Sequence, residues 1–200
     1  MADRREFLRY AMVTAVPLAT GVSLEAAAGT DGATSAAPCA VRHVVIDARH
    51  LESRHFGASL ADAGATVHAL GDGDATGLWQ QTLAGAWRHA PVAVAGLTRA
   101  PALFILEQLA WSHGLRVVYH AEHVVSATAP AAHQVLRAPA GVTGASLARL
   151  DSRWPEHVAD VVARYAPTAT ASRPGPTGAG LLPALPAGAE LLTSWIIAPA

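Results

Sequence analysis

Apolar runs alternate with helical patterns through the middle of the chain, starting at residue 41. The runs predict four strands, over residues 41–47, 66–70, 91–96 and 115–120. The segments between them place leucine, phenylalanine and tryptophan at helical spacing and predict helices over 51–63, 78–87 and 101–112. Strands that alternate with helices at this spacing pair in parallel through right-handed crossovers. The predicted fold is therefore α/β, a small three-layer sandwich with a mainly parallel sheet of about five strands, flavodoxin-like or Rossmann-like.

The pattern weakens beyond the fourth predicted strand. Residues 129–144 are rich in alanine, proline and glycine and are predicted to be irregular, whereas 146–150 and 155–165 are predicted to be helical. Residues 166–189 are rich in proline and glycine and are predicted to be an extended connector. The apolar run after them predicts a last strand at the edge of the sheet. The predicted parts are, in order, an α/β domain (41–165), a connector (166–189) and a returning C-terminal strand (190–200).

The charge balance and the residue types exclude several classes of protein. The chain has 15 acidic and 14 basic residues, and every basic residue is arginine. A chain without a basic excess argues against a nucleic-acid-binding protein. The absence of lysine and asparagine excludes a Schiff-base lysine, a P-loop lysine and N-glycosylation. A single cysteine excludes an internal disulfide and a cysteine-based zinc or iron–sulfur site within the chain.

The first 28 residues are predicted to be an export signal. An apolar stretch over residues 10–24 ends in the alanines of 26–28, which form an A-x-A site of the kind that signal peptidase cuts. The stretch is about 15 residues long, shorter than a membrane-spanning helix needs. The charged segment before it resembles the twin-arginine (Tat) export signal. Four residues carry this resemblance: Arg4, Arg5, Phe7 and Leu8.

The resemblance implies that the protein is exported already folded, to the periplasm or the cell exterior. It implies a transient contact with the Tat translocase and no stable membrane span after cleavage. Residues 29–40, which are rich in glycine, alanine, serine and threonine, are predicted to be a flexible spacer. Proteins that use this route often carry a cofactor, or travel with a partner that does, so a larger exported redox enzyme is a possible partner. Two alternatives stay open: a cut after Ala36, and an uncut leader that tethers the domain to the membrane.

Polar residues follow the carboxyl ends of the predicted strands, which meet at one edge of a parallel sheet. The predicted ligand-binding residues there are Asp47, Arg49, His50, Gly96, Thr98 and Arg99, with Asp72 and Asp74 after the second strand. Gly96 permits a close approach, Thr98 is predicted to cap the following helix, and Arg99 adds a bidentate donor. This combination suits a carboxylate or a phosphate, although a plain helix cap explains the same residues.

The segment after the fourth predicted strand is a candidate metal site. His120 and His123 are three residues apart with Glu122 between them, and two such imidazoles can meet one divalent metal ion if the segment is a turn or a helix. In an extended strand they would point to opposite faces. Partly exposed loop histidines without a metal are the alternative, and no particular cofactor is indicated.

Several other features are predicted to be structural. Trp79, Trp87 and Trp111 lie at helical spacing and are predicted to be core residues rather than an aromatic shelf for a ligand. The glycine-rich segment 71–77 lacks the spacing of a dinucleotide-binding loop. Neither of the two Gly-Ala-Ser segments has the second glycine of a nucleophile elbow.

The sequence therefore predicts a Tat-exported periplasmic accessory or ligand-binding protein, such as the small subunit or escort of an exported redox enzyme. No complete catalytic set supports an enzyme. The alternative is a small metal-assisted hydrolase, in which His120 and His123 would act with one acid, Asp47 or Glu122.

Overall fold

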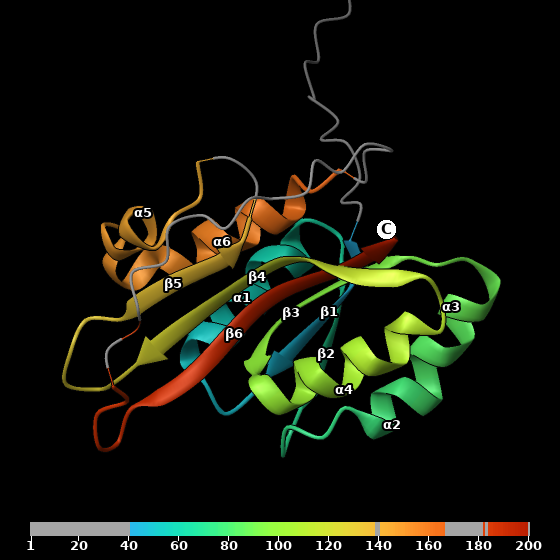
Figure 1. The fold of residues 1–200 in the computed structure, drawn as a ribbon, viewed down its shortest axis with the longest axis horizontal. Helices are drawn as coiled ribbons and strands as arrows, with labels where there is room; N and C mark the ends of the chain where they lie inside the picture. The colour runs from blue at the N-terminus through green and yellow to red at the C-terminus, as the bar shows by residue number, and fades with distance from the viewer. Residues whose placement is uncertain (1–40, 139–140, 167–181, 183, 200) are drawn as a thin grey trace, which may run out of the picture. The chain divides into compact units, whose positions relative to one another are not determined.

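Six strands form one mixed sheet in the order β2-β1-β3-β6-β4-β5. The computed structural model describes residues 41–138, 141–166, 182 and 184–199, so the predicted leader and spacer and most of the connector lie outside the described residues. The strands, drawn as arrows in Figure 1, are β1 (Val41–Asp47), β2 (Thr66–Leu70), β3 (Ala93–Arg99), β4 (Leu115–Val125), β5 (Ala132–Arg137) and β6 (Glu190–Pro199).

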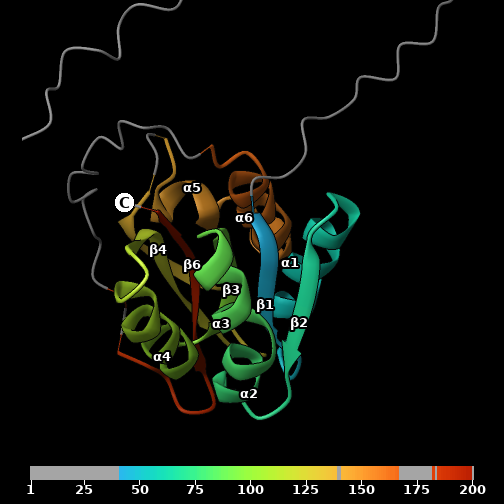
Figure 2. The same ribbon diagram turned by 90° about the vertical axis from the view of Figure 1, so that its right-hand side faces the viewer.

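Helices cover both faces of the sheet, which confirms the predicted layering (Figure 2). One face carries α1 (Leu51–Asp62), α5 (Gly144–Ala148) and α6 (Trp154–Ala163), with the 3₁₀ turn η2 (Asp151–Arg153) before α6. The other face carries α4 (Ala100–Trp111) and a continuous helical segment formed by α2 (Thr76–Leu78), the π-helical turn η1 (Trp79–Leu83) and α3 (Ala84–His89). Each face has its own cluster of buried apolar side chains. No helix in the described part of the chain is long and apolar enough to cross a membrane.

The first half of the chain folds as its pattern predicts. β1 pairs in parallel with both β2 and β3, and α1 and α4 lie within a residue or two of their predicted bounds. Trp87 is a buried core residue, as expected, and Trp79 packs edge-on against it with ring centroids 5.5 Å apart. Trp111 contradicts the same prediction, because half of its surface is exposed at the end of α4.

The second half corrects the predicted sheet. β6 lies between β3 and β4 and is antiparallel to both, rather than at the edge (Figure 1). β5 occupies residues predicted to be irregular and pairs antiparallel with β4. The sheet is therefore mixed and has six strands. The physical reason is burial, since residues 192–198 are all buried, as a strand covered on both faces requires.

Candidate functional site

Asp47 is a buried carboxylate that organises the carboxyl end of the parallel strands. It is the last residue of β1, and none of its surface is exposed. Arg49 binds this carboxylate through two hydrogen bonds: Nε donates to Oδ1 at 2.9 Å and Nη2 donates to Oδ2 at 2.6 Å. Arg99, at the end of β3, adds a longer contact from Nε to Oδ2 at 3.3 Å. One carboxylate therefore holds two guanidinium groups, one from the turn after β1 and one from the end of the neighbouring strand β3.

The backbone around Asp47 is tied to α1 and β3. Ser53, in the first turn of α1, accepts a hydrogen bond from the Asp47 amide at 2.9 Å and donates one to the Leu97 carbonyl. Burial alone would raise the pKa of Asp47, but hydrogen bonds from Arg49 and the positive charges of Arg49 and His50 outweigh it and lower that pKa. Asp47 is therefore ionised at neutral pH and acts as an anchor for the arginines rather than as a ligand group.

Both guanidinium groups lie against Gly73, in the turn after β2. A Cβ built on Gly73 would be 2.8 Å from Nη2 of Arg99 and 3.2 Å from Nη2 of Arg49, and its φ of 87° also favours glycine. Arg99 Nη2 donates to the Asp72 carbonyl at 3.1 Å. The two arginine side chains are 43% and 39% exposed, and within the described residues Nη1 of neither makes a hydrogen bond. Fixed donors therefore remain free for a ligand.

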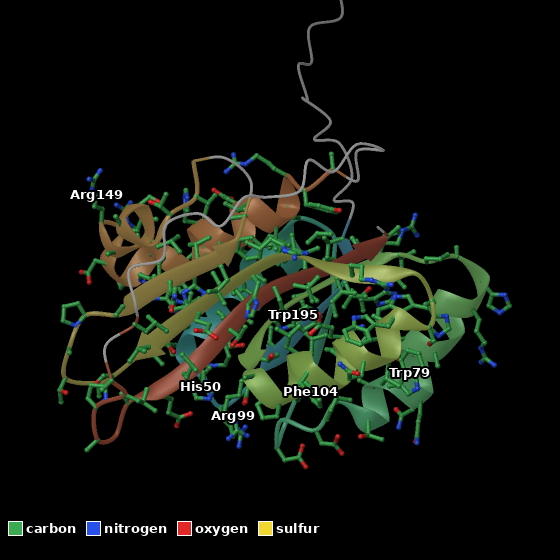
Figure 3. The ribbon with its side chains drawn as sticks, viewed as in Figure 1. His50, Trp79, Arg99, Phe104, Arg149 and Trp195 are labelled. Atoms are coloured by element: carbon green, nitrogen blue, oxygen red, sulfur yellow. The ribbon has the colours of Figure 1, made fainter. Side chains whose placement is uncertain are left out.

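His50 and Glu190 complete the polar edge. Nε2 of His50 lies 3.2 Å from a carboxylate oxygen of Glu190 and 3.8 Å from Oδ2 of Asp47. Figure 3 shows His50 and Arg99 at the same end of the sheet. Glu190 opens β6, and sequence reasoning missed it because nothing in its own segment indicates that β6 lies beside β3.

Gly96 and Thr98 serve the core rather than the site. Thr98 lies in β3, not at the helix cap, and its buried Oγ1 accepts a hydrogen bond from Nε1 of Trp195 at 3.1 Å. A Cβ on Gly96 would be 2.4 Å from the Trp195 ring and 2.8 Å from the Val45 carbonyl oxygen. Both residues make room for the indole at the centre of the sheet (Figure 3). Arg99 occupies the N-cap position of α4 without a side-chain cap.

The candidate metal residues do not converge. His120, Glu122 and His123 all lie in the extended strand β4, where side chains alternate between faces. His123 is fully buried, whereas His120 lines a surface hollow beside α4. Among the residues that the structure describes, no group of three or more histidine, cysteine, aspartate or glutamate side chains is arranged to hold a metal ion. The hydrolase alternative thus lacks the convergence of ligands that it needs.

His123 instead belongs to a buried polar row that crosses three strands. Its Nδ1 lies 2.8 Å from Nδ1 of His133 on β5, and its Nε2 lies 2.7 Å from Oγ of Ser194 on β6. Ser194 donates to the hydroxyl of Tyr119 at 3.2 Å, so the row runs as a donor chain from His133 through His123 to Tyr119. Trp154 stacks on His123 with ring centroids 4.3 Å apart. Both His123 and Ser194 are fully buried, so the hydrogen bond between them satisfies polar groups inside the core and stabilises the fold.

Burial sets the charge of this row. Burial, followed by the charges of His133 and His120, holds the pKa of His123 well below its ordinary value. Burial also lowers the pKa of His133 to about 4. Both imidazoles are therefore neutral at pH 7.

The polar edge offers two fixed guanidinium groups, an imidazole and nearby acidic groups, all anchored by regular structure. The guanidinium groups have the charge and the donors to bind a polar anion, and Asp47 holds them in place. Four residues of this edge were predicted from the sequence: Asp47, Arg49, His50 and Arg99. Since a fold alone does not determine a function, the function has to be argued from this site. No protein-family model, curated protein or solved structure matches the chain.

Proposed function

We propose that this protein is an exported accessory or ligand-binding protein in which Arg49 and Arg99 bind the oxyanion group of a small polar ligand. The observation that carries the proposal is the shared anchor: one buried carboxylate holds both guanidinium groups while both keep free donors. Arginine suits this role because its planar fork matches the geometry of a carboxylate or a phosphate. Side chains that are already fixed lose less conformational entropy when a ligand binds.

The surrounding groups narrow the class of ligand. Asp47 cancels one of the two arginine charges, and the pKa of Arg49 is raised first by its hydrogen bond to Asp47 and further by the charges of Glu190 and Asp72. These acids place acceptors beside the free arginine donors. A ligand that carries hydroxyl or amino groups next to its acidic group satisfies both, so hydroxy acids and amino acids fit better than a bare anion.

The topology supports the location of the site. With β6 set aside, the strand order becomes 2-1-3-4-5, the order of flavodoxin-like sheets. We infer that the fold is a flavodoxin-like variant that differs in two strands: β6 is inserted antiparallel between β3 and β4, and β5 is antiparallel to β4. In such folds ligands bind beyond the carboxyl ends of the strands, which is where the two arginines lie.

The leader supports the place of action. The Tat-like residues favour export of the folded chain to the periplasm or beyond, and they favour a role beside a larger exported redox enzyme. Native mass spectrometry of the protein recovered from the periplasmic and the cytoplasmic fractions of its own cells tests this part of the proposal. Extra mass from a companion chain would support the accessory role, whereas an uncleaved chain confined to the cytoplasm would contradict export.

Calorimetric titration with inorganic phosphate, succinate and L-glutamate tests the site. The double substitution Arg49→Gln, Arg99→Gln should weaken anion binding at least about tenfold, since hydrogen bonds to charged groups contribute about 1.5–3 kcal/mol each. Arg88→Gln is the matched control, because Arg88 is an exposed arginine on α3, away from the site. Equal affinity in the double variant and the Arg88 variant would refute the site, as would the absence of binding by all three anions.

A further inference from the structure

A hollow of about 360 Å³ lies on the face of the sheet that carries α4, away from the Asp47 cluster. Its walls are the second half of α4, the first half of β4 and the end of β5. We propose that this hollow is a second ligand site, which binds a molecule with a planar apolar body and one anionic group. The inference does not rest on the proposed function, because it uses neither Arg49 nor Arg99.

The apolar walls are exposed without an evident structural need. Trp111 is 50% exposed on α4, and Leu136 is 37% exposed on β5. Between them Val117 is almost fully buried and forms part of the floor. Tryptophan has a large flat surface, so its exposure beside a second apolar side chain in a concave site is typical of a ligand pocket. A flat apolar ring that enters here would remove both side chains from water.

The charged residues that line the hollow favour a ligand with a negative charge. Arg116 and Arg137 carry two positive charges, and among the described residues Glu107 is the one acid that lines the hollow. Nη1 of Arg116 donates to the Leu115 carbonyl at 2.7 Å, and Nη1 of Arg137 donates to the Val117 carbonyl. Each guanidinium is thus held by the backbone and keeps other N–H groups for a ligand. One excess positive charge beside an apolar shelf fits a singly charged carboxylate or sulfonate on an aromatic ring.

His120 adds a polar group without adding charge. Its ring lines the same hollow, and burial, followed by the charge of Arg137, lowers its pKa. The imidazole is therefore neutral at pH 7 and can donate or accept one hydrogen bond. The residue that the sequence suggested as a metal ligand is instead part of an organic-ligand pocket in this proposal.

Two fluorescent probes of similar shape test the proposal in the full chain. The anionic probe is 1-anilinonaphthalene-8-sulfonate, and the neutral one is N-phenyl-1-naphthylamine. We expect one saturable site per chain that prefers the anionic probe. Trp111→Ala should weaken both probes at least tenfold. Arg116→Gln combined with Arg137→Gln should weaken the anionic probe at least tenfold and leave the neutral probe within twofold.

Matched control variants distinguish binding in this hollow from non-specific binding of the probes to exposed apolar side chains. Phe104→Ala removes a side chain that is 63% exposed on the same helix but does not line the hollow, so it should change neither affinity. Arg116→Gln alone should still weaken the anionic probe selectively, and it leaves the anchor between Arg137 and β4 intact. Circular dichroism and thermal unfolding verify that each variant is folded.

Three results would overturn the proposal. The first is equal loss of binding in Trp111→Ala and Phe104→Ala, which would mean that the probes cover the whole outer face of α4. The second is an arginine variant that affects both probes alike, which would remove the selection for an anion. The third is a dimer in sedimentation velocity that Trp111→Ala dissociates, which would make the hollow an interface between two copies of the chain.

Discussion

The buried histidine row predicts that the protein loses stability as the pH falls from about 6.5 towards 4. His123 and His133 are neutral in the folded protein because burial lowers both pKa values. In the unfolded chain a histidine has a pKa of about 6.5 and binds a proton below that pH. Below pH 6.5 the two histidines therefore bind protons in the unfolded chain but not in the folded protein. The stability is present in full above pH 6.5 and falls as the pH drops.

The pKa of His133 sets the size of the effect. A fall in the pKa of His133 from its ordinary value of 6.5 to about 4 corresponds to at most about 3.5 kcal/mol, at about 1.4 kcal/mol per pKa unit. His123 adds a loss in the same direction, since its imidazole is fully buried. Burial also lowers the pKa values of His43 and His68, whose rings are hydrogen-bonded at 3.0 Å between β1 and β2. A domain of this size has a total stability of about 5–15 kcal/mol, so the loss is a measurable part of the total.

Urea unfolding followed by tryptophan fluorescence at several pH values measures this slope. Each histidine protonated only in the unfolded chain contributes about 1.4 kcal/mol per pH unit to the free energy of unfolding. His133→Gln should lower the slope between pH 6 and 4.5, and His89→Gln, at an exposed position on α3, is the control. A free energy of unfolding that stays constant over this range would refute the assignment of neutral buried imidazoles.

Three further predictions concern the sheet, the site and export. Gly96→Ala should destabilise the protein by about 3 kcal/mol in urea unfolding, because its Cβ would overlap Trp195, whereas Gly85→Ala has open space and should not destabilise it. Asp47→Asn should cost about 1.5–3 kcal/mol and weaken anion binding, since it removes the charged acceptor of two guanidinium groups that are themselves partly exposed; an unchanged melting temperature would contradict this. Arg4→Lys combined with Arg5→Lys should retain the protein in the cytoplasm, and continued recovery from the periplasmic fraction would argue against Tat export.

Local pattern was enough to predict the first half of the fold. The apolar run that starts at Val41 and the helical spacing after Leu51 each point to one element, and consecutive βα units leave few ways to pair. The second half depends on contacts between distant segments. Apolar and polar residues alternate only weakly along β5, because one of its inward-facing positions is His133. β6 lies more than 90 residues along the chain from β3, with which it pairs. Neither feature is encoded in a short window of sequence.

The candidate site likewise has residues that local sequence pattern could predict and residues that depend on contacts between distant segments. Asp47, Arg49, His50 and Arg99 were predictable because parallel strands deliver the residues at their carboxyl ends to one edge. The structural role of Gly96 could not be predicted, because a glycine that accommodates Trp195 looks the same in sequence as one that accommodates a ligand. The hollow beside α4 gave a different signal. That helix places the apolar side chains of Phe104 and Trp111 on its exposed face, where an amphipathic helix usually carries polar residues.

β6 makes the polar edge and the buried row depend on the same strand. Glu190 contacts His50 at the edge, Ser194 contacts His123 in the row, and Trp195 fills the space over Gly96. Because β6 pairs with both β3 and β4, it joins the parallel and antiparallel parts of the sheet. The sheet is therefore complete only after residues near the end of the chain are in place. If the chain is exported by the route that carries folded proteins, β6 must be in place before translocation, and the proposed anion site is then assembled before the protein leaves the cytoplasm.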